Sequence, residues 1–253
     1  MNTAAPSTST LPNGPLLGRL ANPKRFLALS RWLLPLSAVA AAVLLGAGLY
    51  TALLASPADY QQGETVRIMY IHVPAAWMAL FTYVSMAIAA FTGLVWKHVL
   101  AELYTRAVAP VGAAFTFICL TTGSLWGKPM WGTWWVWDAR LTSVLVLFFL
   151  YIGYIALVDA FDDEQKGLNA GAGLLLVGAV NIPIIKYSVD WWNTLHQPAG
   201  ALSLTSSTVD KSMMLPLLLM AAGFQLLFVA LACLRLKTEI LRRRMRVRQM
   251  GAA

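Results

Sequence analysis

Six long apolar runs constrain the fold of this chain more than any other feature. They lie at residues 33–54, 73–96, 107–125, 141–160, 170–187 and 212–235. Each is about as long as an α-helix needs to cross the hydrocarbon layer of a bilayer, which is roughly 30 Å thick. Because the runs are continuously apolar and do not alternate, they favour helices over a β-barrel. We predict an all-α integral membrane protein with six transmembrane helices.

The composition excludes a soluble domain. Hydrophobic residues make up 58% of the 253 residues and charged residues only 12%, which is too apolar for a soluble protein of this size. The first run is longer than the apolar region of a signal peptide, about 7–15 residues, so we interpret it as an uncleaved anchor. In the fifth run, Pro183 should kink the helix. We predict a membrane domain at 33–235, a polar and basic extension at 1–32, and a basic tail at 236–253.

The distribution of charge predicts the orientation. With six spans, fourteen Lys and Arg residues lie on the side of the two termini and five on the opposite side. Because cytoplasmic segments are enriched in basic residues, both termini are predicted to be cytoplasmic. The net charge of +8 comes mainly from clusters beside apolar runs, which argues against nucleic acid as a partner and fits anionic membrane lipid. The five outer residues are Arg67, Lys128, Arg140, Lys186 and Lys211.

The segment between the third and fourth runs is rich in tryptophan. Residues 126–138 hold five of the ten tryptophans, with two glycines and Pro129. Glycine and proline should break any long regular helix here. A short aromatic segment between two spans should lie at a membrane surface, and the charge distribution puts it on the extracytoplasmic side. Its tryptophans are Trp126, Trp131, Trp134, Trp135 and Trp137.

Two of the three histidines, His72 and His196, lie on the same outer side, whereas His98 lies in an inner loop. Two neutral imidazoles can bind iron from opposite faces of a planar macrocycle. Zinc normally takes about four ligands, including Cys or a carboxylate, and both cysteines, Cys119 and Cys233, lie inside apolar runs. The pattern therefore favours haem over zinc, with His72 and His196 as candidate axial ligands.

A haem at this surface would need further contacts. Its ring would lie against the indole faces, and its propionates would need cations, for which Arg67, Lys128 and Arg140 are candidates. Asp138, at the start of the fourth run, has three possible roles: a pair with Arg140, a helix cap, or contact with the ligand. The sequence contains no C-x-x-C-H motif, so haem is not attached covalently as in a c-type cytochrome. It also contains no phosphate loop.

A resemblance to a known family rests on these same residues. The run Trp131–Thr142, Trp-Gly-Thr-Trp-Trp-Val-Trp-Asp-Ala-Arg-Leu-Thr, resembles the WWD signature of haem-handling membrane proteins. With His72 before Val-Pro and with Trp-Trp-Asn-Thr-Leu-His-Gln at 191–197, it resembles the CcmC family, the haem exporter protein C of bacterial cytochrome c maturation. The signature also occurs in larger cytochrome c synthetase-type proteins. Six spans and two outer histidines point to the CcmC branch, over roughly residues 25–237.

The resemblance implies a multi-pass protein of the bacterial inner membrane with a periplasmic WWD segment at 126–142. It implies that His72 and His196 bind haem b non-covalently, and that haem passes to the periplasmic haem chaperone CcmE. The ATP-binding-cassette pair CcmA and CcmB and the small subunit CcmD would be partners. ATP hydrolysis would occur in the cassette subunit, so this chain is not expected to be an enzyme.

Two other functions remain open from the residues alone. One is a membrane enzyme or quinone-linked oxidoreductase that uses the outer histidines for proton transfer. The lack of carboxylate pairs or a redox thiol motif argues against it. The other is a channel that moves haem or another solute, which predicts polar residues along several spans, and these runs contain few.

Overall fold

The computed structural model describes residues 22–192, 194–196 and 209–250. Six of its helical segments are long and apolar enough to cross a membrane, and α6 and α7 together form the fifth. This confirms the predicted six-helix membrane protein. The elements are α2 (Pro23–Tyr50), the π-helical turn η1 (Thr51–Ala55), the 3-10 helix η2 (Glu64–Ile68), α3 (Met69–Trp96), α4 (Val99–Trp131), α5 (Ala139–Asp159), α6 (Glu164–Gly178), α7 (Asn181–Trp191) and α8 (Lys211–Met250).

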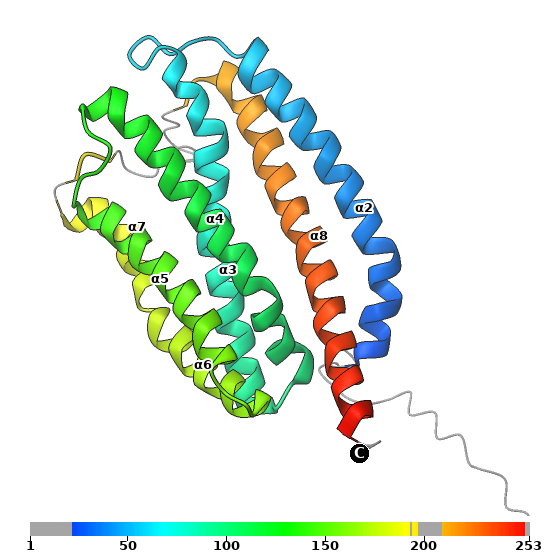
Figure 1. The fold of residues 1–253 in the computed structure, drawn as a ribbon. Helices are drawn as coiled ribbons and strands as arrows, with labels where there is room; N and C mark the ends of the chain where they lie inside the picture. Colours follow the sequence, from blue (N-terminus) through cyan, green and yellow to red (C-terminus); the bar gives the residue numbers. More distant parts are fainter. Residues whose placement is uncertain (1–21, 193, 197–208, 251–253) are drawn as a thin grey trace, which may run out of the picture.

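The helices form one bundle with α3 and α4 in its centre (Figure 1). Along one edge α2 packs beside α8, and α5, α6 and α7 form the opposite edge. Glycines let α2 and α8 approach closely: a Cβ atom at Gly48 would lie 2.7 Å from Met220 Sδ, and one at Gly223 would lie 2.7 Å from Leu45 Cδ2. Small residues commonly permit this close helix packing in membranes. The start of α2 and the end of α8 lie at the same end of the bundle.

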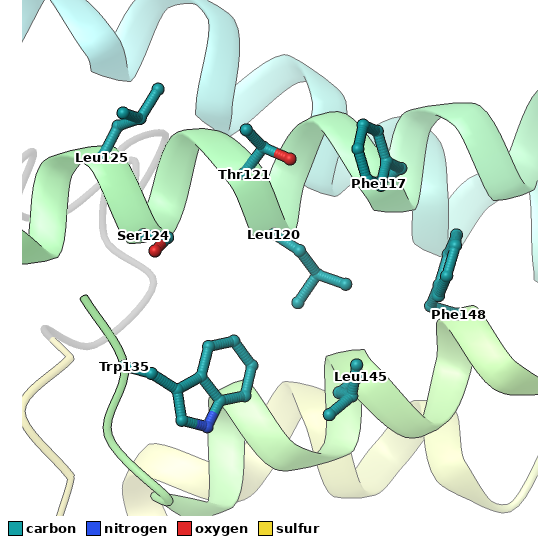
Figure 2. Close-up of a pocket in the computed structure, with 8 residues that line it drawn as sticks. All are labelled: Phe117, Leu120, Thr121, Ser124, Leu125, Trp135, Leu145 and Phe148. Atoms are coloured by element: carbon teal, nitrogen blue, oxygen red, sulfur yellow. The ribbon is translucent and has the colours of Figure 1, made fainter.

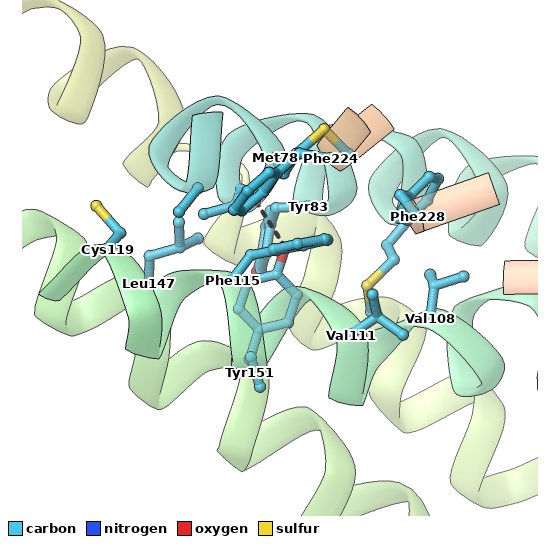
Figure 3. Packing of buried hydrophobic residues seen from close by; sticks show 14 of the residues in the cluster. Met78, Tyr83, Val108, Val111, Phe115, Cys119, Leu147, Tyr151, Phe224 and Phe228 are labelled. Atoms are coloured by element: carbon cyan, nitrogen blue, oxygen red, sulfur yellow. Dashed lines mark hydrogen bonds between the residues drawn. The ribbon is translucent and has the colours of Figure 1, made fainter. Parts of the chain in front are cut away.

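Buried tyrosines connect α5 to the two central helices, α3 and α4 (Figure 3). The rings of Tyr83 and Tyr151 meet edge to face, with centroids 5.3 Å apart. The Tyr151 hydroxyl donates to the carbonyl oxygen of Ala79 at 2.8 Å, which links α5 to α3. The Tyr154 hydroxyl donates to Thr105 Oγ1 at 2.8 Å, which links α5 to α4. These bonds satisfy hydroxyl groups that would be costly to bury unpaired in an apolar core.

The third transmembrane helix is longer than its apolar run. The prediction that Gly127 and Pro129 break the helix is wrong, because α4 continues through both residues to Trp131. It ends at Gly132, whose φ of +76° is a conformation that favours glycine. Gly127 is tolerated because it makes room: a Cβ atom there would lie 3.1 Å from Cε3 of Trp131. The non-helical part of the tryptophan-rich segment is therefore limited to residues 132–138.

The fifth span is divided, as Pro183 suggests, but the break lies upstream of the proline. α6 ends at Gly178 and α7 begins at Asn181, so Pro183 lies in the first turn of α7. Proline is accepted there because the first N–H groups of a helix have no intrahelical partner. The Asn181 amide donates to the carbonyl oxygen of Ser143 at 2.9 Å, which fixes the break against α5.

Ion pairs stabilise the end of the bundle where α2 begins and α8 ends. Arg106 of α4 lies 2.6 Å from Asp159 of α5 and 3.8 Å from Glu239 of α8. His98, expected to be an ordinary loop residue, caps α4, since its Nδ1 accepts from the Ala101 N–H at 3.1 Å. α8 continues to Met250, well past the apolar run that ends at residue 235. Residues 1–21 of the predicted N-terminal extension, with Arg19, lie outside the described residues.

Candidate functional site

His72 lies in the first turn of α3, against α4. Its Nδ1 is 3.0 Å from the carbonyl oxygen of Cys119 and 3.0 Å from Thr122 Oγ1. A carbonyl oxygen can only accept, so this contact requires the hydrogen on Nδ1 and leaves the lone pair on Nε2. Gly123 makes room for the ring, because a Cβ atom at that position would lie 3.1 Å from His72 Cε1.

His196 lies beyond the end of α7 and contacts the start of α5. Its Nδ1 is 3.1 Å from Asp138 Oδ2. The other carboxylate oxygen of Asp138 accepts the Leu141 N–H at 2.7 Å, which caps α5. Of the three roles left open for Asp138, the structure therefore shows the helix cap. It also shows a contact with His196 that the sequence did not predict.

The two histidines have the same hydrogen-bonding arrangement. Each Nδ1 faces an acceptor of the protein, so each neutral ring has its lone pair on Nε2. The two imidazoles also lie near enough that a positive charge on one would disfavour a positive charge on the other. Burial lowers the pKa of His196 below its usual value, although the hydrogen bond to Asp138 opposes this effect. His196 is therefore neutral at neutral pH, which is the form that binds metal.

The five tryptophans of the segment do not share one environment. Trp131 contacts the candidate ligand, with its ring centroid 5.0 Å from that of His196. Trp126 meets Trp131 edge to face at 5.0 Å, and its Nε1 donates to Gln62 Oε1 at 2.9 Å. Trp134 and Trp137 are 55% and 76% exposed. Of the five, Trp131 thus contacts His196, and Trp126 packs against Trp131.

Trp135 lines a different feature, an apolar groove of about 390 Å³ between α4 and α5 (Figure 2). Its Nε1 is buried and has no hydrogen-bond partner among the described residues. On α4 the groove is lined by side chains such as Phe117, Thr121 and Ser124. The helical repeat puts these residues on the opposite face from Cys119 and Thr122. The groove is therefore separate from the histidine pair.

The three cations expected near the propionates all have partners within the protein. Arg67 pairs with Glu64, and its Nη1 donates to the carbonyl oxygen of Ala52 at 2.7 Å. Lys128 Nζ donates to the Gly132 carbonyl oxygen at 3.1 Å, and it lies 5.9 Å from the centroid of the Trp134 ring. This bond occupies one of the three donors of the ammonium group.

Arg140 holds α7. Its Nε donates to Ser188 Oγ at 3.1 Å, and its Nη2 donates to the carbonyl oxygens of Ile185 and Lys186 at 3.3 and 3.1 Å. The guanidinium therefore satisfies carbonyl groups near the end of α7, the helix that leads to His196. These hydrogen bonds between α5 and α7 could not be predicted from the spacing of residues along the chain.

The donor set suits a planar macrocycle better than a bare ion. Within the ranges that the structure describes, no group of three or more His, Cys, Asp and Glu residues could hold a metal ion. A zinc site would need about four ligands, whereas haem iron needs only axial ligands from the protein.

The residues that the sequence did not suggest are Gln62, Thr122 and Gly123, with the carbonyl group of Cys119. The sequence signal for this contact is that a threonine and a glycine precede the tryptophan-rich segment by about one helical turn.

Known proteins resemble this chain over nearly its whole length. The family model CcmC, described as "Heme exporter protein C", matches residues 16–251. A protein of that name from Bradyrhizobium diazoefficiens is 58% identical over 234 residues, covering 92% of this chain and 89% of the relative. One from Escherichia coli K12 is 52% identical over 89% of this chain and 91% of its own length.

A relative from a plant is also similar. A "Putative cytochrome c biosynthesis ccmC-like mitochondrial protein" of Marchantia polymorpha is 48% identical, over 70% of this chain and 74% of the relative. The run Trp131–Thr142 meets His196 in the structure through Trp131 and Asp138. On the extent of the family match and the identity of these relatives, the chain belongs to the CcmC family.

Proposed function

We propose that this chain holds haem b non-covalently at the periplasmic face of the bacterial inner membrane and delivers it for cytochrome c maturation. The names of the relatives, for haem export and cytochrome c biosynthesis, support a role in this process. His72 and His196 are the proposed axial ligands. The observation that carries the proposal is their matched arrangement, in which each Nδ1 is bound to the protein and each Nε2 keeps its lone pair.

The surroundings of the pair are suited to a flat, largely apolar cargo. Trp131 and Trp126 supply aromatic surface next to His196, and aromatic faces stack on planar rings. Trp134 and Trp137 are exposed near the same end of the bundle. Lys128, whose side chain is exposed and uses one donor within the protein, is the best placed of the three cations for a propionate. Arg67 and Arg140 would contribute mainly through their charge.

Delivery of haem would require partner proteins. The haem chaperone CcmE would take haem from the periplasmic face. The cassette subunits CcmA and CcmB would hydrolyse ATP, and the small subunit CcmD would complete the complex. This chain would act as a haem-handling component and not as an enzyme. When bound, haem would supply iron with two exchangeable axial positions, and the protein's part would be to hold and orient those ligands.

The proposal is tested by the absorption spectrum of the full chain purified in detergent and loaded with haem. We expect the wild type to show a low-spin haem spectrum. The double variant His72→Ala and His196→Ala should lose that spectrum and should no longer transfer haem to CcmE, because no axial nitrogen ligands remain. A low-spin spectrum that is unchanged in the double variant would contradict the ligand assignment.

The third histidine offers a matched control. His98→Asn also removes an imidazole, but asparagine retains an acceptor that can cap α4. Its spectrum and haem transfer should equal those of the wild type. The thermal stability of each haem-free variant, measured in the same detergent, separates loss of a ligand from loss of the fold.

A further inference from the structure

The carboxylate of Asp138 is the one charged group that contacts either histidine directly in the described residues. Only 5% of its side chain is exposed. One oxygen accepts the Leu141 N–H at 2.7 Å and the other faces His196 Nδ1 at 3.1 Å. The N-terminus of α5 favours a negative charge at this position, because the helix dipole and the first N–H groups both point toward it. The carboxylate of Asp138 thus connects the first turn of α5 to His196.

Asp138 is not hydrogen-bonded to the nearest arginine. Arg140 follows two residues later, but its guanidinium is bonded to Ser188 and to two carbonyl oxygens of α7. Over the part of the chain that the structure describes, His196 is the side chain that faces the Asp138 carboxylate at hydrogen-bond distance. The carboxylate therefore acts on that imidazole at hydrogen-bond distance, whereas it acts on Arg140 only from farther away.

The support of His72 is chemically different. Its Nδ1 contacts the Cys119 carbonyl oxygen and the Thr122 hydroxyl, which are both neutral. An ionised acceptor makes a stronger hydrogen bond than a neutral one. A carboxylate partner raises the basicity of a metal-bound imidazole and fixes its orientation. The two candidate ligands are therefore unequal, although their residue type and tautomer are the same.

We propose that Asp138 is a positioning residue that makes His196 the stronger of the two haem ligands. This proposal rests on the proposed function. The carboxylate aligns the imidazole and would increase its donor strength toward iron, which favours the ferric form. His72, on a neutral support, is then the weaker ligand. An unequal pair suits a protein that must keep its haem and also release it to a partner.

Asp138→Asn separates the charge from the helix cap. Asparagine caps helices about as well as aspartate, so the haem-free variant should keep its thermal stability. We expect a low-spin spectrum, a dissociation constant for ferric haem about 10 to 100 times higher than that of the wild type, and a higher midpoint potential. Titration of the full-length apoprotein with ferric haem and a spectroelectrochemical titration measure these quantities.

Thr122→Val is the matched control on the other ligand. It removes a neutral acceptor from His72 but leaves the Cys119 carbonyl oxygen, so affinity and potential should change much less. If Asp138→Asn has the affinity and potential of the wild type, Asp138 serves only as a cap and the positioning role is wrong. In that case, loss of the low-spin spectrum in His196→Ala leaves the proposed function intact. If His196→Ala keeps that spectrum, both proposals are overturned.

Discussion

Gly123 lies against His72, and the lack of a side chain there makes room for the imidazole. A Cβ atom would lie 3.1 Å from His72 Cε1, which is closer than ordinary van der Waals contact between carbon atoms. The ring is also held by the Cys119 carbonyl oxygen, 3.0 Å from its Nδ1. It therefore has little freedom to move away without losing that hydrogen bond.

Gly123→Val should weaken haem binding while leaving both histidines in the chain. The valine methyl groups would push the His72 ring from its support, and we expect the haem dissociation constant to rise roughly tenfold or more, as for other disturbed ligand supports. Gly173→Val is the control, because no atom lies within 4 Å of a Cβ atom placed there. Equal haem affinity in the two variants would show that Gly123 has no part in placing His72.

For single residues, the sequence indicates which residue types belong to the candidate site but not which atoms they contact. His72, His196 and the tryptophans could be singled out because few residue types bind iron or stack on a planar ring. The support of His72 could not, since the Cys119 carbonyl belongs to the backbone and every residue has one. Arg140 was expected near a propionate, but its partners on α7 are about 45 residues away in sequence.

Among the elements, α2 depends on a single neighbour. It packs along α8 at the edge of the bundle (Figure 1), and only 17% of its most apolar stretch is buried within the chain. At Gly223 a Cβ atom would lie 2.7 Å from Leu45 Cδ2 and 3.2 Å from the Leu45 backbone nitrogen. A side chain cannot displace a backbone atom unless the helix itself moves.

Gly223→Ile should therefore separate α2 from α8 and destabilise the protein. Overpacking of this kind typically costs about 1–3 kcal/mol, and the thermal unfolding midpoint in detergent should fall accordingly. Gly173→Ile, at an open position of α6, carries the same change in side chain and helix propensity. A midpoint that falls equally in both variants would mean that close packing of α2 on α8 adds nothing to stability.

The helix ends show which parts of an element the apolar pattern can predict. All six spans were found from hydropathy, because lipid requires apolar surface on each of them. The pattern stops where the membrane stops, so it missed the last turns of α4 and the polar end of α8. The ends themselves are set by local chemistry: Gly132 in a left-handed conformation and the side chain of Asp138 at the start of α5.

In the whole molecule, the two ends of the bundle differ in chemistry. One end carries the start of α2, the end of α8 (Figure 1) and ion pairs such as Arg106–Asp159 and Arg246–Glu164. The histidine pair and the tryptophan-rich segment lie at the opposite end. The excess of Lys and Arg on the side of the termini predicts that this side is cytoplasmic. The proposed delivery of haem to a periplasmic partner depends on this orientation.

Cysteine labelling of the full chain in right-side-out spheroplasts tests the orientation. Tyr60, in the loop between η1 and η2, is 91% exposed, and Arg248 is exposed near the end of α8. Tyr60→Cys should react at once with a membrane-impermeant maleimide, whereas Arg248→Cys should react only after the membrane is permeabilised. The native Cys119 and Cys233 are buried, at 6% and 5% exposure, so the unmodified chain serves as the blank. The reverse pattern would put the histidine pair in the cytoplasm, where haem could not pass directly to a periplasmic chaperone.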